Sequence, residues 1–202
     1  MFIVTDQEGN VKKYRSLSKK TLCDVTIECT TDATVNNAVL NRCKIHSKHD
    51  ITFNRCHINH CNLSYVAVFF VETVSYATHY DNVTFKNVQH SSIACGGIYN
   101  SELREIRAHF IGVDFHKIVL RGICHDIYLS RCRGMVSASG LGNSDRTAYC
   151  YNSPDGPMVA LGCFRGTRKF AAYTIATKYN GSPSGKLYSK AVNMLFDLLE
   201  DQ

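Results

Sequence analysis

The stretch VNNAVLNRCKIHSKHDITFNRCHINHCNL, residues 35–63, decides the fold. An α-helix repeats about every 3.6 residues and a strand about every two, so neither explains a recurrence of five. A chain that turns a corner every five residues does. Large apolar side chains recur at this spacing, with one offset in the middle, at Val35, Leu40, Ile45, Phe53, Ile58 and Leu63. Small or thiol side chains lie two positions before most of them, at Ala38, Cys43, Cys56 and Cys61.

The same spacing continues on both sides of this stretch. We therefore predict a mainly β fold, a right-handed β-solenoid over residues 22–135 with a square cross-section. Each pentad would form one side of a coil, and its large apolar residue would fill the axis. About four pentads would complete a coil, and roughly five or six coils would stack about 4.8 Å apart. The flanking positions are Leu22, Ile27, Ile98, Leu103, Phe110, Phe115 and Leu120.

The pattern is interrupted between Val66 and Ser92. We interpret Glu72–Asp81 as a loop or a bulged coil. The interruption leaves open a less regular, triangular β-helix built from the same coils, and a β-sandwich is the competing fold.

Ten cysteines in one chain need an explanation. Since Cys is a small, readily buried side chain, a narrow solenoid interior accounts for many of them without disulfides. The pentad pattern places Cys43, Cys56 and Cys61 inward and His46 and His57 outward. Ligands on opposite sides of a sheet cannot converge on one ion, so we predict no metal and no cofactor. The cysteines are Cys23, Cys29, Cys43, Cys56, Cys61, Cys95, Cys124, Cys132, Cys150 and Cys163.

The two ends differ from the repeats. Residues 1–21 predict a β cap that covers the open end of the solenoid, with strands at 2–4 and 11–14. Residues 136–202 predict a small α+β (ββαα) module. It would begin with SASGLGNSD as a linker, followed by strands at 146–151 and 158–163 around a Pro/Gly turn. Helices are expected at 168–178, with Thr167 as N-cap, and at 187–199.

The last helix is expected to be amphipathic. Its apolar side would carry Leu187, Val192, Leu195, Phe196 and Leu199.

The net charge of +6 is concentrated at the two ends of the chain. The first 21 residues carry five Lys/Arg against two Asp/Glu, whereas the long middle region is nearly neutral. A protein that tracks along DNA usually shows a continuous basic stripe. The start MFIVTDQEGN lacks a signal peptide pattern, and no apolar run is long enough to span a membrane. These features predict a cytoplasmic protein without a membrane partner.

The segments NAVLNRCKIHS, NRCHINHCNLS and GGIYNSELRE resemble degenerate pentapeptide repeats. The tail TAYCYNSPDGPMVALGCFRGT resembles a C-terminal module of uncharacterised bacteriophage and prophage proteins, in which it follows such repeats. Their GCF-x-GT signature matches Gly162, Cys163, Phe164, Gly166 and Thr167. The next helix departs from theirs, because Arg168-Lys169-Phe170 replaces an acidic start. The resemblance implies a phage origin, hence the host cytoplasm, and names no activity.

One corner of the tail predicts a candidate ligand-binding site. Amides at a helix start, together with three cations, could hold a phosphate group. The alternative is a strand-to-helix corner with exposed basic residues. The candidate residues are Arg165, Gly166, Thr167, Arg168 and Lys169.

Enzyme motifs are not apparent. The acidic residues of the solenoid are scattered, the cysteines and histidines form no nucleophile pattern, and no phosphate-binding or zinc-protease motif occurs. We therefore expect a phage accessory protein that acts by binding a host protein or a defence-system component, and homo-oligomers are plausible. One alternative is a sponge for a small nucleotide that uses the basic corner. The other is a nucleic-acid-binding protein, whose affinity should fall steeply with salt.

Overall fold

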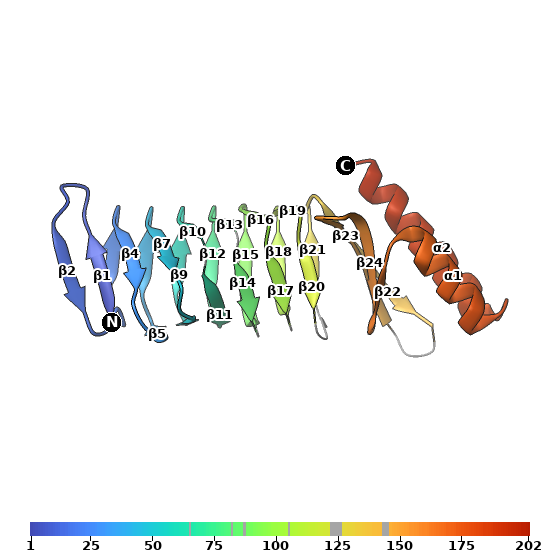
Figure 1. The fold of residues 1–202 in the computed structure, drawn as a ribbon, viewed down its shortest axis with the longest axis horizontal. Coiled ribbons are helices and arrows are strands. Elements are labelled where there is room, and N and C mark those ends of the chain that lie inside the picture. Colours follow the sequence, from blue (N-terminus) through green and yellow to red (C-terminus); the bar gives the residue numbers. More distant parts are fainter. Residues whose placement is uncertain (65, 82, 87, 105, 122–126, 143–145) are drawn as a thin grey trace.

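The computed structural model describes residues 1–64, 66–81, 83–86, 88–104, 106–121, 127–142 and 146–202. Over these residues the chain is mainly β, a solenoid of stacked coils that ends in a small sheet and two helices (Figure 1). The predicted fold class is confirmed.

Each coil contributes one strand to each of three faces, and strands on one face pair in parallel with those of the next coil. Face 1 contains β4 (Thr26–Cys29), β7 (Lys44–Ser47), β10 (Asn62–Ser64), β13 (His79–Asp81), β16 (Gly97–Tyr99) and β19 (Asp114–His116). Face 2 contains β5 (Ala33–Asn36), β8 (Ile51–Asn54), β11 (Ala67–Val71), β14 (Thr84–Lys86), β17 (Glu102–Arg104) and β20 (Val119–Arg121). Face 3 contains β3 (Thr21–Cys23), β6 (Val39–Asn41), β9 (His57–Asn59), β12 (Val74–Tyr76), β15 (Gln89–Ala94), β18 (Arg107–Ile111) and β21 (Tyr128–Ser130).

The cross-section is triangular, so the predicted square coil is wrong. Hydrogen bonds between neighbouring coils join residues that are 17 or 18 positions apart, as from Cys43 N to Cys61 Sγ and from Cys56 N to Thr73 Oγ1, whereas four pentads would need 20. The reason lies in the long strands β8 and β11 of face 2, which each place two apolar side chains inward, whereas β7 and β9 bury one apolar side chain each. Ile51 and Phe53 are both buried on β8.

The segment Glu72–Asp81, expected to be a loop or a bulged coil, forms two regular sides of a coil, the strands β12 and β13. Most of its inward positions carry polar side chains, so a search for recurring apolar residues does not detect these strands. Thr73, Ser75 and Thr78 are all buried there.

Two corners of each coil carry small inward side chains, and the predicted inward positions of Cys43, Cys56 and Cys61 are confirmed, since all three are buried. The Cys56 thiol donates to the carbonyl of Val35 at 3.3 Å. In the next coil, the Thr73 hydroxyl makes the equivalent bond to Phe53 O at 2.9 Å. A thiol and a hydroxyl therefore perform the same task, tying each corner to the preceding coil.

The N-terminal cap is an antiparallel hairpin of β1 (Phe2–Thr5) and β2 (Val11–Tyr14). Strand β1 pairs antiparallel with β4 and buries Phe2 and Val4 against the first coil. The hairpin thereby covers the end of face 1.

The C-terminal module contains an antiparallel sheet of β22 (Met135–Leu141), β23 (Arg146–Ser153), β24 (Gly156–Leu161) and β25 (Phe164–Gly166). Most of the predicted linker is therefore strand β22, and residues 143–145 of that linker lie outside the described residues. The predicted strand at 146–151 and the Pro/Gly turn after it are confirmed. The strand predicted at 158–163 begins at Gly156 and ends at Leu161, and the sheet has four strands where the predicted ββαα module has two.

The sheet has two apolar sides because successive side chains of a strand point to opposite faces. On β23, Tyr149 and Tyr151 join the solenoid core, whereas Ala148 and Cys150 pack with the helices. The sheet therefore closes the C-terminal end of the solenoid (Figure 1).

The helices are α1 (Arg168–Tyr179) and α2 (Pro183–Glu200), close to the predicted ranges. Leu187, predicted on the apolar side of the last helix, is 41% exposed, and the neighbouring Tyr188 is buried in its place. The remaining four predicted apolar positions of this helix are buried.

Candidate functional site

The predicted basic corner lies where β25 ends and α1 begins. Thr167 is the N-cap of α1, as predicted, and its hydroxyl accepts a hydrogen bond from Phe170 N at 3.4 Å. Gly166 lies under two aromatic rings, since a Cβ there would be 2.8 Å from Phe164 and 2.7 Å from Phe170. Local packing thus accounts for the glycine and the threonine of this corner.

The cations of the corner contact different partners. Arg168 reaches along α2, where it lies 2.7 Å from Asp197 and 3.8 Å from Glu200 and donates to Asn193 Oδ1 at 3.1 Å. Lys169 is exposed on α1. The corner therefore does not bring its cations to one point.

Arg165 instead reaches the end of the solenoid. Its Nε donates to the carbonyl of Leu120 at 2.9 Å, and its Nη1 donates to Gly162 O at 3.3 Å. Leu120 belongs to β20, on face 2. Arg165 thereby links the C-terminal module to the last coil.

Beside this link lies an open pocket of about 580 Å³, here called the junction pocket. Its cations come from three strands, since Arg104 lies on β17, Arg121 on β20 and Arg165 on β25. Sequence reasoning named Arg165 and missed the two solenoid arginines. Their 17-residue spacing, which equals one coil, was the available signal. The pocket is lined by Arg104, Val119, Leu120, Arg121, Tyr151, Met158 and Arg165.

One carboxylate bridges the two solenoid arginines. Arg104 donates from Nε and Nη2 to Glu102 Oε1 at 2.9 and 2.7 Å, and Arg121 Nε lies 3.2 Å from Glu102 Oε2. Arg104 and Arg121 also occupy the same register position on neighbouring coils. Two cations stacked in this way repel each other, and Glu102 offsets part of that repulsion.

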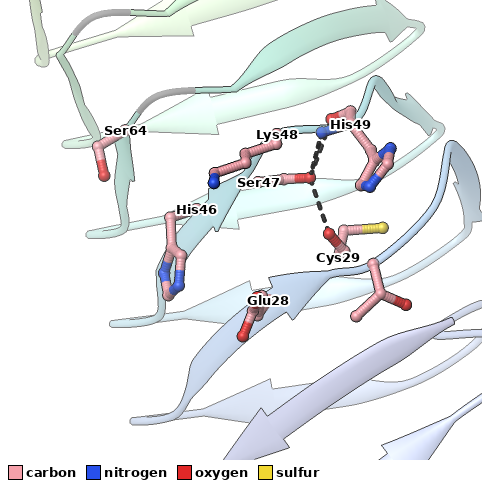
Figure 2. Close-up of a pocket in the computed structure, with 8 residues that line it drawn as sticks. Glu28, Cys29, His46, Ser47, Lys48, His49 and Ser64 are labelled. Carbon is pink, nitrogen blue, oxygen red and sulfur yellow. Dashed lines mark hydrogen bonds between the residues drawn. The ribbon is translucent and has the colours of Figure 1, made fainter.

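A second cavity, of about 630 Å³, lies along the first coils between faces 1 and 2. Figure 2 shows Glu28 and His46 on neighbouring strands, with Ser47, Lys48 and His49 following. The Ser47 hydroxyl donates to Cys29 O at 3.1 Å and accepts from His49 N at 2.9 Å. This serine therefore holds the corner of the coil together.

The Cys29 thiol in that cavity also forms a local hydrogen bond. Cys29 Sγ donates to Thr31 O at 2.9 Å, and burial raises the pKa of this thiol. A raised pKa reduces the thiolate that a nucleophile needs. The cavity thus contains Ser, Cys and His side chains in an arrangement that supports the local fold.

The cysteines and histidines of residues 43–61 lie on two sides of the coil wall. The three inward cysteines are buried, and His46 and His57 are exposed on faces 1 and 3. In the ranges that the structure describes, no group of three His, Cys, Asp or Glu side chains is arranged to hold a metal ion. Cys124 and His125 lie outside these ranges.

Face 3 carries exposed apolar side chains on β12, β18 and β21, and this set is here called the apolar face. Val74 and Tyr76 on β12 are 43% and 46% exposed, and Tyr128 on β21 is 57% exposed. Ile111 on β18 occupies the same register position as Ser130 of β21. The corresponding positions on β6 and β9 carry Asn41 and Asn59.

Comparison of the chain with models of protein families and with curated proteins finds no match. Within the described part of the chain, neither helix combines the length and the apolar character that a membrane span requires.

Proposed function

We propose that this protein is a non-enzymatic binding module that holds a partner protein on the apolar face. The observation that carries the proposal is the exposure of Val74, Tyr76, Ile111 and Tyr128 on one face, on the strands β12, β18 and β21. Strand β15, between β12 and β18, carries Ser92 and Ala94 at the corresponding positions.

A flat solenoid face suits such a role because its backbone is fixed by the coils on either side. Little ordering is then required on binding, which favours affinity. Tyrosine is enriched at protein interfaces, since it offers a large apolar area and a polar end. The ring centroids of Tyr76 and His60 lie 5.8 Å apart, and those of Tyr128 and His109 lie 4.7 Å apart. Each tyrosine ring therefore packs against a neighbouring histidine ring.

The partner that we propose is a host protein or a component of a host defence system, met in the host cytoplasm. Support for this choice comes from the likeness of the GCF-x-GT tail, residues 162–167, to phage and prophage modules. The apolar face supports the mode of binding, and the tail supports the choice of target.

Site-specific photo-crosslinking tests this proposal. A photoreactive phenylalanine analogue replaces Tyr76 or Tyr128, and matched controls carry it at exposed His46 on face 1 or Thr34 on face 2. We expect one host protein to crosslink from the two positions on the apolar face and from neither control. Ile111→Glu should then weaken the purified complex at least tenfold, since it places a charge in an apolar contact.

Two results would contradict the proposal. Equal crosslinking from all four positions would indicate nonspecific contact. Crosslinking only to a second copy of this chain would replace the host partner with a homo-oligomer built on the same face.

A further inference from the structure

We propose that this protein forms a two-fold symmetric dimer, in which a second copy of the chain docks antiparallel along the outer flank of α2 and the edge of β22. This surface belongs to the C-terminal module and is separate from the apolar face. The proposal therefore does not rest on the function proposed for that face.

The two helices cover one side of the C-terminal sheet and lie side by side (Figure 1). Helix α1 packs on β24 and β25, and α2 packs beside it, mostly on β22 and β23. Strand β22 is at the edge of this sheet. The flank of α2 that faces away from α1 therefore lies above that edge.

This outer flank of α2 carries an exposed apolar seam. Leu187, Met194 and Leu198 are 41%, 45% and 47% exposed. At about 100° per residue, the three side chains fall within about 40° of one another, on the opposite side of the helix from Phe196. Phe196 marks the side toward α1, since its ring centroid lies 5.8 Å from the guanidinium of Arg168. The seam is therefore the side of α2 that α1 does not reach.

The edge of β22 continues this apolar surface. Val136 and Ala138 are half-buried on the helix side of the sheet. The strand MVSASGL contains no charged residue and no proline, which are two common protections of a sheet edge. Its one irregularity is a shift of register between Ala138 and Leu141. Among the described strands, only β23 pairs with it, so its other edge is open to a second chain.

Two contacts show how α2 runs over β22. Tyr188 packs over Gly142, where a Cβ would clash with its hydroxyl, and Gly134 N donates a hydrogen bond to Gln202 Oε1 at 2.7 Å. Helix and strand are therefore antiparallel, and the middle of α2, near Met194, lies over the middle of β22. One two-fold axis at this place would bring together two β22 edges and two α2 flanks.

The spacing of the two layers fits this arrangement. Strands of a sheet lie about 4.8 Å apart, so a helix centred over β22 and β23 would lie about 5 Å from such an axis. Its copy would then lie about 10 Å away, close to the usual distance between packed helices. Around this axis Met194 would face its own copy, and Leu187 of one chain would face Leu198 of the other.

The charges beside the seam favour an antiparallel pair of helices. Lys186 and Lys190 lie in the N-terminal half of α2, whereas Asp197 and its C-cap Asp201 lie at the C-terminal end. In an antiparallel pair centred near Met194, the lysines of each copy would lie beside the aspartates of the other. A parallel pair would instead place like charges together, and such flanking charges set the orientation of paired helices.

Sedimentation velocity of the full chain, across a dilution series from micromolar to submillimolar concentration, measures the association. We expect a monomer–dimer equilibrium with a dissociation constant in the micromolar range, because one helix flank and one strand edge make a small interface. Thermal unfolding of each variant below verifies that it is folded.

Three substitutions test the seam and its charges. Met194→Asp should weaken the dimer about tenfold or more, since it places two like charges near the symmetry axis. Lys190→Glu and Asp201→Lys should each weaken it severalfold, and the double variant should regain most of that loss. Asp201 is changed rather than Asp197 because Asp197 also pairs with Arg168 of its own chain.

Tyr173→Asp on α1 and Ile111→Glu on the apolar face are the matched controls, since each replaces an exposed apolar side chain elsewhere. Both should leave the dissociation constant unchanged. A chain that stays monomeric across the series would overturn the proposal, and so would a dimer that Met194→Asp leaves intact. A dimer that only Ile111→Glu dissociates would assign self-association to the apolar face instead. Charge variants without effect would contradict the antiparallel arrangement.

Discussion

The hydroxyl of Tyr80 donates a hydrogen bond to Ser75 Oγ at 2.5 Å in the interior of the solenoid, where neither side chain is exposed. Burial raises the pKa of Tyr80, so this hydroxyl stays protonated and available as a donor. The pair fills the axis of one coil at positions where neighbouring coils place Ile58 and Leu63. Two polar side chains can therefore be buried among apolar ones here, because they form a hydrogen bond with each other.

Ser75→Ala should destabilise the protein by about 1–3 kcal/mol, since the Tyr80 hydroxyl would lose its acceptor in a buried site. Tyr80→Phe should also destabilise it. The double variant should cost less than the sum of the two, because neither polar group is then left unpaired. Urea unfolding of the four proteins measures this cycle, and strictly additive effects would argue against the coupling.

Replacing Cys56 or Cys61 with Ala should cost about 1 kcal/mol or somewhat more, because each thiol packs in a narrow core. Cys61→Asp should prevent the coil from forming, since an unpaired charge would be buried. Burial raises the pKa of the Cys56 thiol, which slows its reaction further.

Thiol labelling of the native protein distinguishes these sites without substitution. The exposed Cys23, Cys95 and Cys163 should react at once, and Cys43, Cys56 and Cys61 only after denaturant is added. Fast labelling of all six would contradict the inward positions, as would stoichiometric zinc in elemental analysis.

His46→Gln and His57→Gln should each change the free energy of unfolding by no more than about 0.5 kcal/mol. Both imidazoles are exposed on the outside of the coils. A loss above 1 kcal/mol in a denaturant titration, beyond the usual range for surface sites, would show that these rings support the fold.

Gly134→Ala should loosen the junction between the solenoid and the C-terminal module. Gly134 has a φ of +70°, and a Cβ there would lie 1.8 Å from the Phe115 carbonyl oxygen. We expect a loss of at least about 2 kcal/mol from the combined clash and strain.

Gly156→Ala is the matched control for this change. Gly156 also has a positive φ, of +101°, but a Cβ there would meet nothing within 4 Å. An equal loss of stability at the two positions in thermal unfolding would show that backbone strain alone matters.

The sequence predicted the solenoid because inward residues repeat. The longer spacing between Ile45 and Phe53 corresponds to the third, longer side of the coil. That offset of eight residues, added to two steps of five, makes one triangular coil of 18. The square section was wrong because Ile51 was not counted as an inward residue. Counting it assigns two inward positions to the long side.

Two other features were hidden for physical reasons. At residues 72–81 several inward positions carry hydroxyl side chains in place of apolar ones. These hydroxyl groups donate hydrogen bonds to carbonyls of the preceding coil, as the thiols do at other corners. The strand at 135–141 is rich in Gly and Ser, and tertiary pairing with β23 overrides that composition.

The candidate site shows the same limit. Arg165 was found from its local motif, whereas its neighbours Arg104 and Arg121 are distant in sequence and meet it only through the stacking of coils. A local motif indicates a cation, and only the fold shows which other cations share its pocket.

The stacking of coils has a mechanical consequence. Hydrogen bonds between parallel strands run across the strands, which here is along the axis of the solenoid. The N-terminus lies in the cap at one end of the solenoid. The C-terminus follows α2 and lies past the last coil at the other end (Figure 1). A tension applied between the two termini would load these bonds in line and open one coil boundary at a time. The covalent chain would still connect the coils on the two sides of an opened boundary.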